Sequence, residues 1–183
     1  MKNLWAPWRY VYIRGNKDKE CFFCKMIKED KDSENYIIYR GKYNFIVLNK
    51  YPYSPGHLMV VPYSHISQLS ELRDEASLEF INLIDYSIRL LKATFEPQGF
   101  NVGMNIGKVA GAGVEDHIHA HVVPRWTGDS NFITVIGETR VISEALEETY
   151  QKLIDAIQNK NIPLKINLMF EKSSFSFRLI IIF

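Results

Sequence analysis

Short runs of apolar and β-branched residues, separated by turn-forming residues, precede the first long helical pattern of the chain. Tyr36–Tyr39 and Phe45–Leu48 flank Gly41–Asn44, an arrangement typical of a β-hairpin. A third run, His57–Pro62, follows Tyr51–Gly56, which contains two prolines and a glycine. The pattern therefore predicts three successive strands.

From Ser70 to about Phe95 the apolar residues recur every three or four positions, and Pro97 follows the run. This spacing predicts one long amphipathic helix. Its apolar positions are Leu72, Ala76, Phe80, Leu83, Ile84, Ile88, Leu91 and Phe95. Beyond it, Phe100–Ile106 and His117–Pro124 predict two more strands, separated by a flexible loop that includes Gly107–Gly113.

A second helix is predicted over Ser143–Gln158. The order of three strands, a helix and two strands predicts an α+β fold, with an antiparallel sheet of about five strands and the long helix packed on one face. We expect one domain over residues 1–183. It comprises an N-terminal arm (1–35), a core (36–132) and a C-terminal helix and tail (133–183), whose apolar end, Ser173–Phe183, suggests no function.

The composition narrows the class of protein. The formal net charge is +1, from 22 basic and 21 acidic residues, so we expect no nucleic acid polymer as a partner. No stretch approaches the roughly 20 apolar residues of a membrane span, and Met1–Arg9 lacks the apolar core of a signal peptide. We expect a cytoplasmic protein that does not interact with a membrane.

Three of the five histidines, His117, His119 and His121, alternate with apolar residues between Asp116 and Arg125. On a helix this spacing would scatter the rings, but on a strand it places all three on one side. The other side is then free to pack into a core. Such a strand concentrates titratable, nucleophilic and metal-binding capacity on one face.

A neutral imidazole can attack phosphorus to form a phosphoramidate, which a second nucleophile then resolves. The stretch Gly107–Gly113 offers backbone N–H groups to an anion, and Lys108 and Arg125 are candidate counter-charges. The alternatives are a loop that only turns the chain, histidines that are exposed polar positions, and a trio of zinc ligands. Three histidines on one face beside glycines favour chemistry.

The two cysteines, Cys21 and Cys24, have the spacing of a zinc knuckle but cannot complete a tetrahedral site by themselves. A redox pair and two unreactive thiols are the alternatives, and no thioredoxin-like βαβ context supports the redox one. The remaining histidines are His57, at the start of the third strand, and His65, ahead of the long helix.

With these motifs the chain resembles the histidine triad (HIT) family, whose signature alternates histidine with apolar residues. The resemblance extends from about Cys21 to Phe132. Two further segments resemble the branch that contains bacterial diadenosine tetraphosphate phosphorylases and the fragile-histidine-triad dinucleoside polyphosphate hydrolases. The family motifs are His117–Val123, Leu48–Pro62 and Asn105–Gly107, and the branch segments are Leu4–Arg9 and Trp126–Phe132.

The resemblance implies an enzyme that cleaves dinucleoside polyphosphates, by hydrolysis or phosphorolysis, through a covalent nucleotidyl-histidine. It makes His119 the nucleophile, while His121 contacts the phosphate or the leaving oxygen. The positions implied for the substrate are Asn49 at the ribose, Asn105 on the phosphate side, Gly107 and Gly113 in the phosphate-binding loop, and apolar pocket walls near Phe45 and Leu48.

The resemblance also implies a structural zinc ion that tethers the N-terminal segment to the sheet, and no organic cofactor. Its ligands are Cys21, Cys24, His65 and His117, whereas His57 is implied to be a structural residue of its turn. The family further implies a homodimer or a higher homo-oligomer, with the helix from Ser70 at the interface.

The loop Ala110–Val114 lacks the Gln-Thr pair of the fragile-histidine-triad proteins, which favours the phosphorylase-like subgroup. Three alternative functions remain from the sequence. They are a purine nucleoside phosphoramidate hydrolase, a nucleotide-binding signalling module of the same fold, and a metallohydrolase in which the three triad histidines hold a catalytic zinc.

Overall fold

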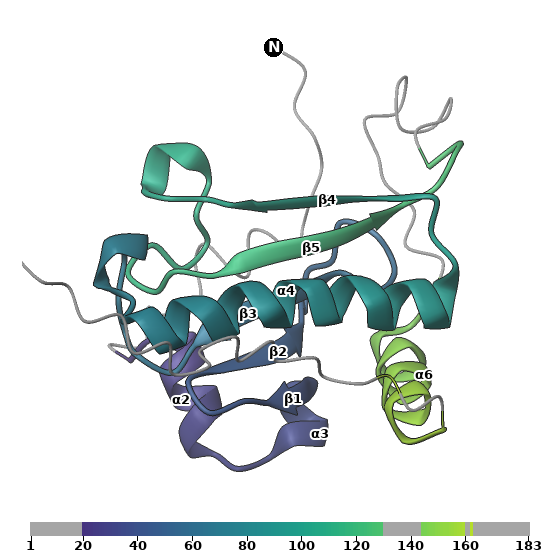
Figure 1. Cartoon of the computed structure of the whole chain (residues 1–183), viewed down its shortest axis with the longest axis horizontal. Helices are drawn as coiled ribbons and strands as arrows, with labels where there is room; N and C mark the ends of the chain where they lie inside the picture. Colours follow the sequence, from purple (N-terminus) through teal and green to yellow (C-terminus); the bar gives the residue numbers. More distant parts are fainter. Residues whose placement is uncertain (1–19, 130–143, 160–161, 163–183) are drawn as a thin grey trace, which may run out of the picture.

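The computed structural model describes residues 20–129, 144–159 and 162. In this part of the chain five strands form one antiparallel sheet with the order β1-β2-β3-β5-β4 (Figure 1). The strands are β1 (Ile37–Arg40), β2 (Asn44–Leu48), β3 (Leu58–Pro62), β4 (Gly99–Met104) and β5 (Ala120–Arg125). The predicted α+β sheet is confirmed, with β5 between β3 and the edge strand β4.

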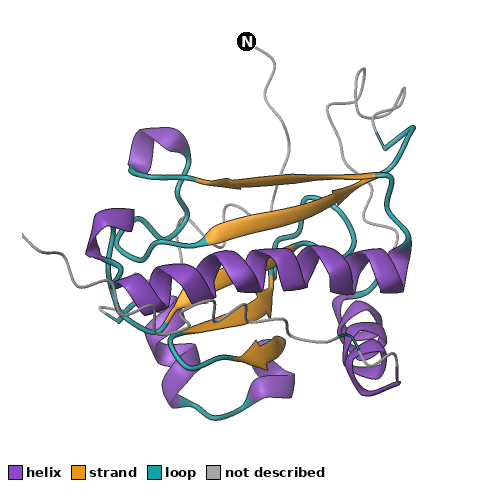
Figure 2. Cartoon of the chain, viewed as in Figure 1, coloured by secondary structure: helices purple, strands orange, loops and turns teal. Residues whose placement is uncertain are grey.

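Four α-helices and two 3-10 turns complete the described residues (Figure 2). They are α2 (Phe22–Lys28), α3 (Asp32–Asn35), η1 (Leu69–Glu71), α4 (Asp74–Phe95), η2 (Lys108–Ala110) and α6 (Leu146–Asn159). The predicted helix start at Ser70 was wrong, because extended backbone at Leu72 and Arg73 separates η1 from α4. At the actual start, Asp74 and Glu75 complement the positive end of the helix dipole.

Strands β2 and β3 are buried on both faces of the sheet, and strand alternation decides which side chain goes to which face. One set packs against α4 and α6, the second against α2. The first set includes Ile46, Leu48, Leu58, Val60, Ala120 and Val122 of the strands, with Phe80, Leu83, Leu90 and Leu153 of the helices. The second contains Phe23, Met26, Ile37, Phe45, Val47, Met59 and Val61. The sequence predicted that the long helix packs on one face of the sheet, but it did not predict that α2 covers the other face.

A buried carboxylate joins the β1–β2 turn to α4. Glu79 accepts the backbone N–H groups of Lys42, Tyr43 and Asn44 at 2.7–2.8 Å, and the side-chain amide of Asn44 at 2.8 Å. Asn44 and Glu79 are both buried, where an N–H group or a carboxylate without a partner would be costly. The interaction therefore fixes the hairpin against the long helix.

The turn between β2 and β3 is pressed against neighbouring elements. Gly56 has φ 76°, and a Cβ there would lie 2.9 Å from a Leu91 side-chain carbon, so only glycine fits. The Ser54 hydroxyl donates to the Pro124 carbonyl at 3.0 Å. These contacts hold His57 at the entrance to β3.

The triad strand is shorter than predicted. It begins at Ala120 instead of His117, because β4 ends at Met104, the partner of Ala120. Ahead of this pair, the Ile118 N–H donates to the Ile66 carbonyl at 2.7 Å. The triad thus starts on an irregular segment that lies beside residues following β3.

Other boundaries moved by a few residues. The strand predicted over Phe100–Ile106 occupies Gly99–Met104, and the helix predicted over Ser143–Gln158 occupies Leu146–Asn159. The arm up to Arg14 and the tail Ser173–Phe183 lie outside the described residues. No helix among the described residues is both long enough and apolar enough to span a membrane.

Candidate active site and metal centre

Three histidine side chains meet beside the β3–β5 pairing. The ring centroids of His119 and His121 are 4.9 Å apart, and those of His121 and His57 are 5.1 Å apart. Met59 pairs with His121 in the register, so His57 and His121 are diagonal neighbours on the same face. The sequence placed two of these rings together and assigned the third, His57, to its turn.

Phe23 of α2 joins this group to a second one. Its ring lies 5.1 Å from His119 and 5.3 Å from His117, between centroids. His117 in turn lies 5.2 Å from His65. With Phe23 between His117 and His119, the five histidines of the chain therefore lie in one continuous row of ring contacts.

A backbone hydrogen bond defines the tautomer of His119. Its Nδ1 lies 2.9 Å from the His117 carbonyl oxygen, which can only accept, so Nδ1 carries the proton. In the neutral ring, Nε2 then carries a lone pair. His119 is buried, with 5% of its surface exposed.

The tautomer of His121 is defined through His57. The Tyr53 backbone N–H donates to His57 Nδ1 at 3.1 Å, so neutral His57 carries its proton on Nε2. His57 Nε2 then donates to His121 Nδ1 at 3.0 Å, which leaves the proton of neutral His121 on its Nε2. His119 and His121 thus have opposite tautomers: the Nε2 of His119 accepts, and that of His121 donates.

Burial keeps these rings neutral. Desolvation lowers the pKa of His119, against the opposing effect of its bond to the His117 carbonyl. Burial, with a smaller effect of His119, lowers the pKa of His121 to about 4. Burial, followed by His121 and His119, lowers the pKa of His57 to about 3. At neutral pH an unprotonated nitrogen is therefore available for nucleophilic attack.

Of the two asparagines implied to bind substrate, Asn49 contacts the histidine group. Asn49 follows β2, its Oδ1 accepts the Tyr51 N–H at 2.9 Å, and its Nδ2 lies 3.4 Å from His57 Nδ1. Asn105 directly follows β4 and is half-buried. Asn49 is thereby tied to the histidine group.

The glycine loop follows β4 and contains the 3-10 turn η2. Gly107 precedes this turn with φ 84°, a conformation that favours glycine, whereas Gly113 is an exposed residue beyond it. Lys108 is exposed on the turn. Arg125, in contrast, donates to both carboxylate oxygens of Asp129 at 2.5 and 2.7 Å, so its predicted role as a phosphate counter-charge is not supported.

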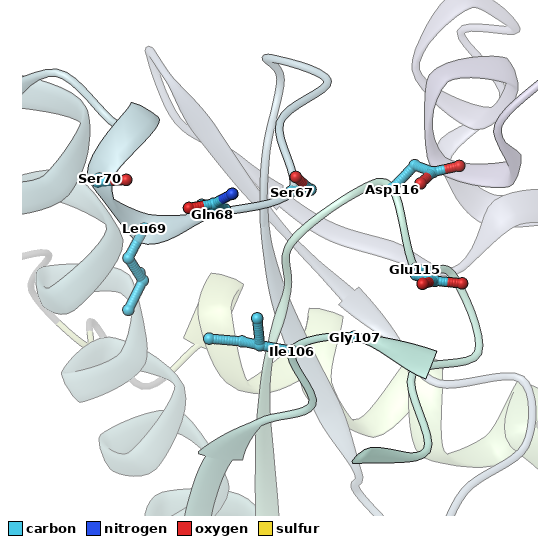
Figure 3. A pocket seen from close by; sticks show the side chains of 8 residues that line it. All are labelled: Ser67, Gln68, Leu69, Ser70, Ile106, Gly107, Glu115 and Asp116. Atoms are coloured by element: carbon cyan, nitrogen blue, oxygen red, sulfur yellow. The ribbon is translucent and has the colours of Figure 1, made fainter. Parts of the chain in front are cut away.

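The loop also borders a cavity of about 460 Å³. Figure 3 shows that its walls come from the segment before α4 and from the two ends of the β4–β5 connection. The lining residues are Ser67, Gln68, Leu69, Ser70, Ile106, Gly107, Glu115 and Asp116. No histidine lines it, so the cavity is separate from the paired rings.

Cys21, Cys24, His65 and His117 converge as the resemblance implies, with their ligand atoms within 4.8 Å of one another. The Sγ atoms of Cys21 and Cys24 lie 3.4 and 3.7 Å from His117 Nδ1, and Cys24 Sγ lies 3.4 Å from His65 Nδ1. Tetrahedral zinc with ordinary bond lengths would separate sulfur and nitrogen ligands by about 3.6 Å. The geometry fits zinc.

The surroundings of the cluster also suit a metal. His117 Nε2 donates to the Pro62 carbonyl at 2.8 Å, which turns its Nδ1 lone pair toward the thiols. Burial is the main cause that lowers the pKa of His117, so this ring is neutral. Burial, followed by the neighbouring Cys21, raises the pKa of the Cys24 thiol. A bound zinc would instead hold both thiols as thiolates.

The three triad histidines do not form a metal site of their own. His119 Nδ1 and His121 Nδ1 are both engaged in hydrogen bonds, and His117 faces the cysteines. Within residues 20–129, 144–159 and 162, one group of three or more potential ligands was found, and it is the Cys21–Cys24–His65–His117 cluster. The metallohydrolase alternative therefore has no structural support.

Sequence reasoning did not identify His57, Phe23 or Tyr53 as parts of this site. The Tyr53 ring lies over His57 and His121, with centroid distances of 4.6 and 5.8 Å. Strand alternation was a usable signal for His57. It lies two residues before Met59, so both side chains point to the same face, and Met59 pairs with His121. For Phe23 no periodic signal exists, since its position depends on how α2 docks.

Comparison with known proteins adds independent information. A family model described as the HIT domain matches residues 30–128. The chain is 42% identical over 161 residues to a Mycobacterium tuberculosis protein named AP-4-A phosphorylase, which covers 84% of this chain and 83% of that protein. It is 33% identical over 116 residues to the adenosine 5'-monophosphoramidase of Saccharomyces cerevisiae, with 63% and 69% covered.

Among solved structures, a zinc-bound histidine triad family protein from Mycobacterium smegmatis superposes with a TM-score of 0.64. The two chains are 27% identical, and the match covers 78% of this chain and 96% of the other. The sheet and its long helix are thus a shared architecture.

The buried His57 predicts an acid-sensitive fold. Its pKa is lower in the folded state, so the unfolded chain takes up the proton first and stability falls as the pH drops from about 6.5 toward about 3. Between pH 7 and pH 5 this histidine should account for a loss of about 2 kcal/mol. Urea denaturation at pH 7 and pH 5 gives the loss of unfolding free energy for the wild type and for His57→Gln. The difference between the two losses is the contribution of His57, because any zinc release common to both proteins cancels. Equal losses in the two proteins would contradict it.

Proposed function

The chain belongs to the HIT domain family, and on that premise we propose that it cleaves dinucleoside polyphosphates by transferring a nucleotidyl group through His119. The observation that carries the proposal is the pair of opposite tautomers. One ring presents a lone pair and its neighbour presents a proton, 4.9 Å apart between centroids. A nucleophile beside a donor is the minimum set for displacement at phosphorus.

In the first step the Nε2 lone pair of His119 attacks the α-phosphorus. A P–N bond forms, the P–O bond to the leaving nucleotide breaks, and the Nε2–H of His121 donates to an oxygen of the phosphate or of the leaving group. In the second step an oxygen of inorganic phosphate attacks the same phosphorus and the P–N bond breaks. His119 is restored, and a nucleoside diphosphate is released.

The surrounding residues would orient the substrate. Backbone N–H groups of the loop from Gly107 to Gly113, with Asn105 and the exposed Lys108, would bind the phosphate side of the substrate. Asn49 would contact the ribose through the donor and acceptor capacity left by its bonds within the β2–β3 turn.

Phosphate is the acceptor that we favour over water. The support is the 42% identity to the protein named AP-4-A phosphorylase, over most of both chains. A phosphoramidate is the second candidate substrate, since the relative named adenosine 5'-monophosphoramidase is 33% identical. Both substrates would use the same nucleophile and differ in the leaving group.

We also propose that zinc occupies the Cys21–Cys24–His65–His117 cluster. The separations suit tetrahedral coordination, and both cysteines are free thiols, as a reducing cytoplasmic location would preserve them. When bound, the metal would supply structural cross-linking, joining α2 to the segments that follow β3 and precede β5. It takes no part in the displacement.

A homodimer built on β4 completes the proposal. Among the described residues this strand is one of the two edges of the sheet, the other being β1, and its central positions are exposed, including Val102 with 47% of its surface exposed. Ile81 of α4 is also exposed, at 62%. An apolar, unpaired edge of this kind favours pairing with a second copy.

The first experiment identifies the products from diadenosine tetraphosphate. With inorganic phosphate the wild type should release ATP and ADP, and His119→Ala should lower turnover by at least about three orders of magnitude because no covalent intermediate can form. Near-wild-type cleavage by that variant would refute the mechanism. Cleavage of adenosine 5'-phosphoramidate alone would move the assignment to the second candidate.

The metal proposal predicts about one equivalent of zinc in protein purified without added metal. Cys24→Ser should lower both the zinc content and the melting temperature, because one of four ligands is lost. His57→Gln is the matched control, since it alters a histidine outside the cluster, and it should retain its zinc. Well under one equivalent in the wild type, with no destabilisation by a chelator, would rule out structural zinc.

Sedimentation velocity tests the dimer. The wild type should sediment as a dimer, and Val102→Glu should shift it toward monomer by placing like charges at the paired edge. Val109→Glu adds the same charge at a fully exposed loop position and should leave the dimer intact. A monomeric wild type at micromolar concentration would contradict the proposal.

A further inference from the structure

Phe23 lies between the metal cluster and the proposed nucleophile. The side chain is buried, with 2% of its surface exposed, and its ring contacts both His117 and His119. In sequence it lies between Cys21 and Cys24, two of the four cluster residues. One aromatic ring therefore touches a metal ligand and the reactive histidine at once.

The cluster determines where this ring points. Cys21 is the residue at the N-cap position of α2 and Cys24 lies within the first turn, so their two sulfur atoms lie on both sides of Phe23 in the sequence and anchor the start of the helix. Their partners, His117 and His65, belong to the sheet side of the molecule. With both thiols held, the start of α2 cannot rotate or slide relative to His117 and His65, so the Phe23 ring keeps its place.

The His119 ring needs such a neighbour. Its bond to the His117 carbonyl fixes the tautomer, but one hydrogen bond leaves the outer ring torsion broadly defined. Phe23 packs at 56° to the ring on one flank, and His121 at 77° on another. The bond to phosphorus requires Nε2 to be aimed along a narrow approach.

We propose that Phe23 is a positioning residue that aims the His119 ring and makes its orientation depend on the metal cluster, an inference that rests on the proposed nucleophilic role of His119. Phe23 acts without touching substrate. The cluster thereby becomes more than a tether for the N-terminal segment, because its loss is transmitted through one side chain to the reactive nitrogen.

The substitution Phe23→Leu keeps an apolar side chain but removes the flat ring. It should lower kcat by about 10- to 100-fold with little change in KM, because misorientation affects the chemical step more than binding. The ¹⁵N and ¹H signals of the His119 ring should shift or broaden. Met26→Leu, equally buried on the same helix, is the matched control and should retain kcat and the ring signals.

The link to the metal needs a combined experiment. Chelation of the wild type, and separately Cys24→Ser, should perturb the His119 ring signals in the same way as Phe23→Leu. In Phe23→Leu itself, chelation should cause little further loss of kcat, because the two changes act through one path. Thermal unfolding of each protein shows that the measurements concern folded molecules.

Wild-type ring signals and kcat in folded Phe23→Leu would overturn the inference, as would an equal loss of kcat in Met26→Leu. Fully additive effects of chelation and Phe23→Leu would overturn the link to the metal. If the wild type cleaves none of the substrates, the proposed function fails, and the His119 ring signals still decide whether Phe23 and the cluster orient the ring.

Discussion

The antiparallel pairing of β3 with β5 is the constraint on which the rest of the structure depends. Its register places Met59 opposite His121 and Leu58 opposite Val122, so both strands send alternate side chains to the same two faces. One face packs against α4 and α6, and the other carries the imidazoles. A slip of one residue would exchange the faces, turning histidines into the apolar core and core residues toward α2. The hydrophobic packing of one face against α4 and α6 thus holds the histidines in place on the other.

Within that frame, hydrogen bonds to the backbone make chemically identical rings different. The carbonyl of His117 leaves His119 with a free lone pair, whereas the N–H of Tyr53 acts through His57 to leave His121 with an outward proton. Because burial keeps all of them neutral, each role depends on a tautomer and not on charge. At the other end of the row, the Nδ1 of His117 faces the Cys21 and Cys24 thiols. Main-chain groups around the rings therefore determine the tautomer of each histidine.

The fold class was predictable because it depends on local periodicity. A period of two marks strands and a period near 3.6 marks helices, so the sheet, the long helix and the common face of the triad followed from residue spacing. The errors lie at the ends of elements. The triad strand begins at Ala120 because the Ile118 amide bonds to Ile66, and α4 begins at Asp74 because the preceding residues are extended. Such boundaries depend on partners distant in sequence, which spacing does not specify.

For the candidate site, the sequence by itself predicted the histidine strand and, through the family motif, the four cysteine and histidine residues whose side chains converge. It assigned His57 to a turn and left Phe23 unassigned between two cysteines. Only the tertiary structure decided that His57 bonds to His121 and that Phe23 packs against His119. The physical reason is that the face of a strand to which a side chain points depends on the backbone of that segment alone. A tautomer or a ring orientation depends on atoms that other segments bring within hydrogen-bonding or van der Waals distance.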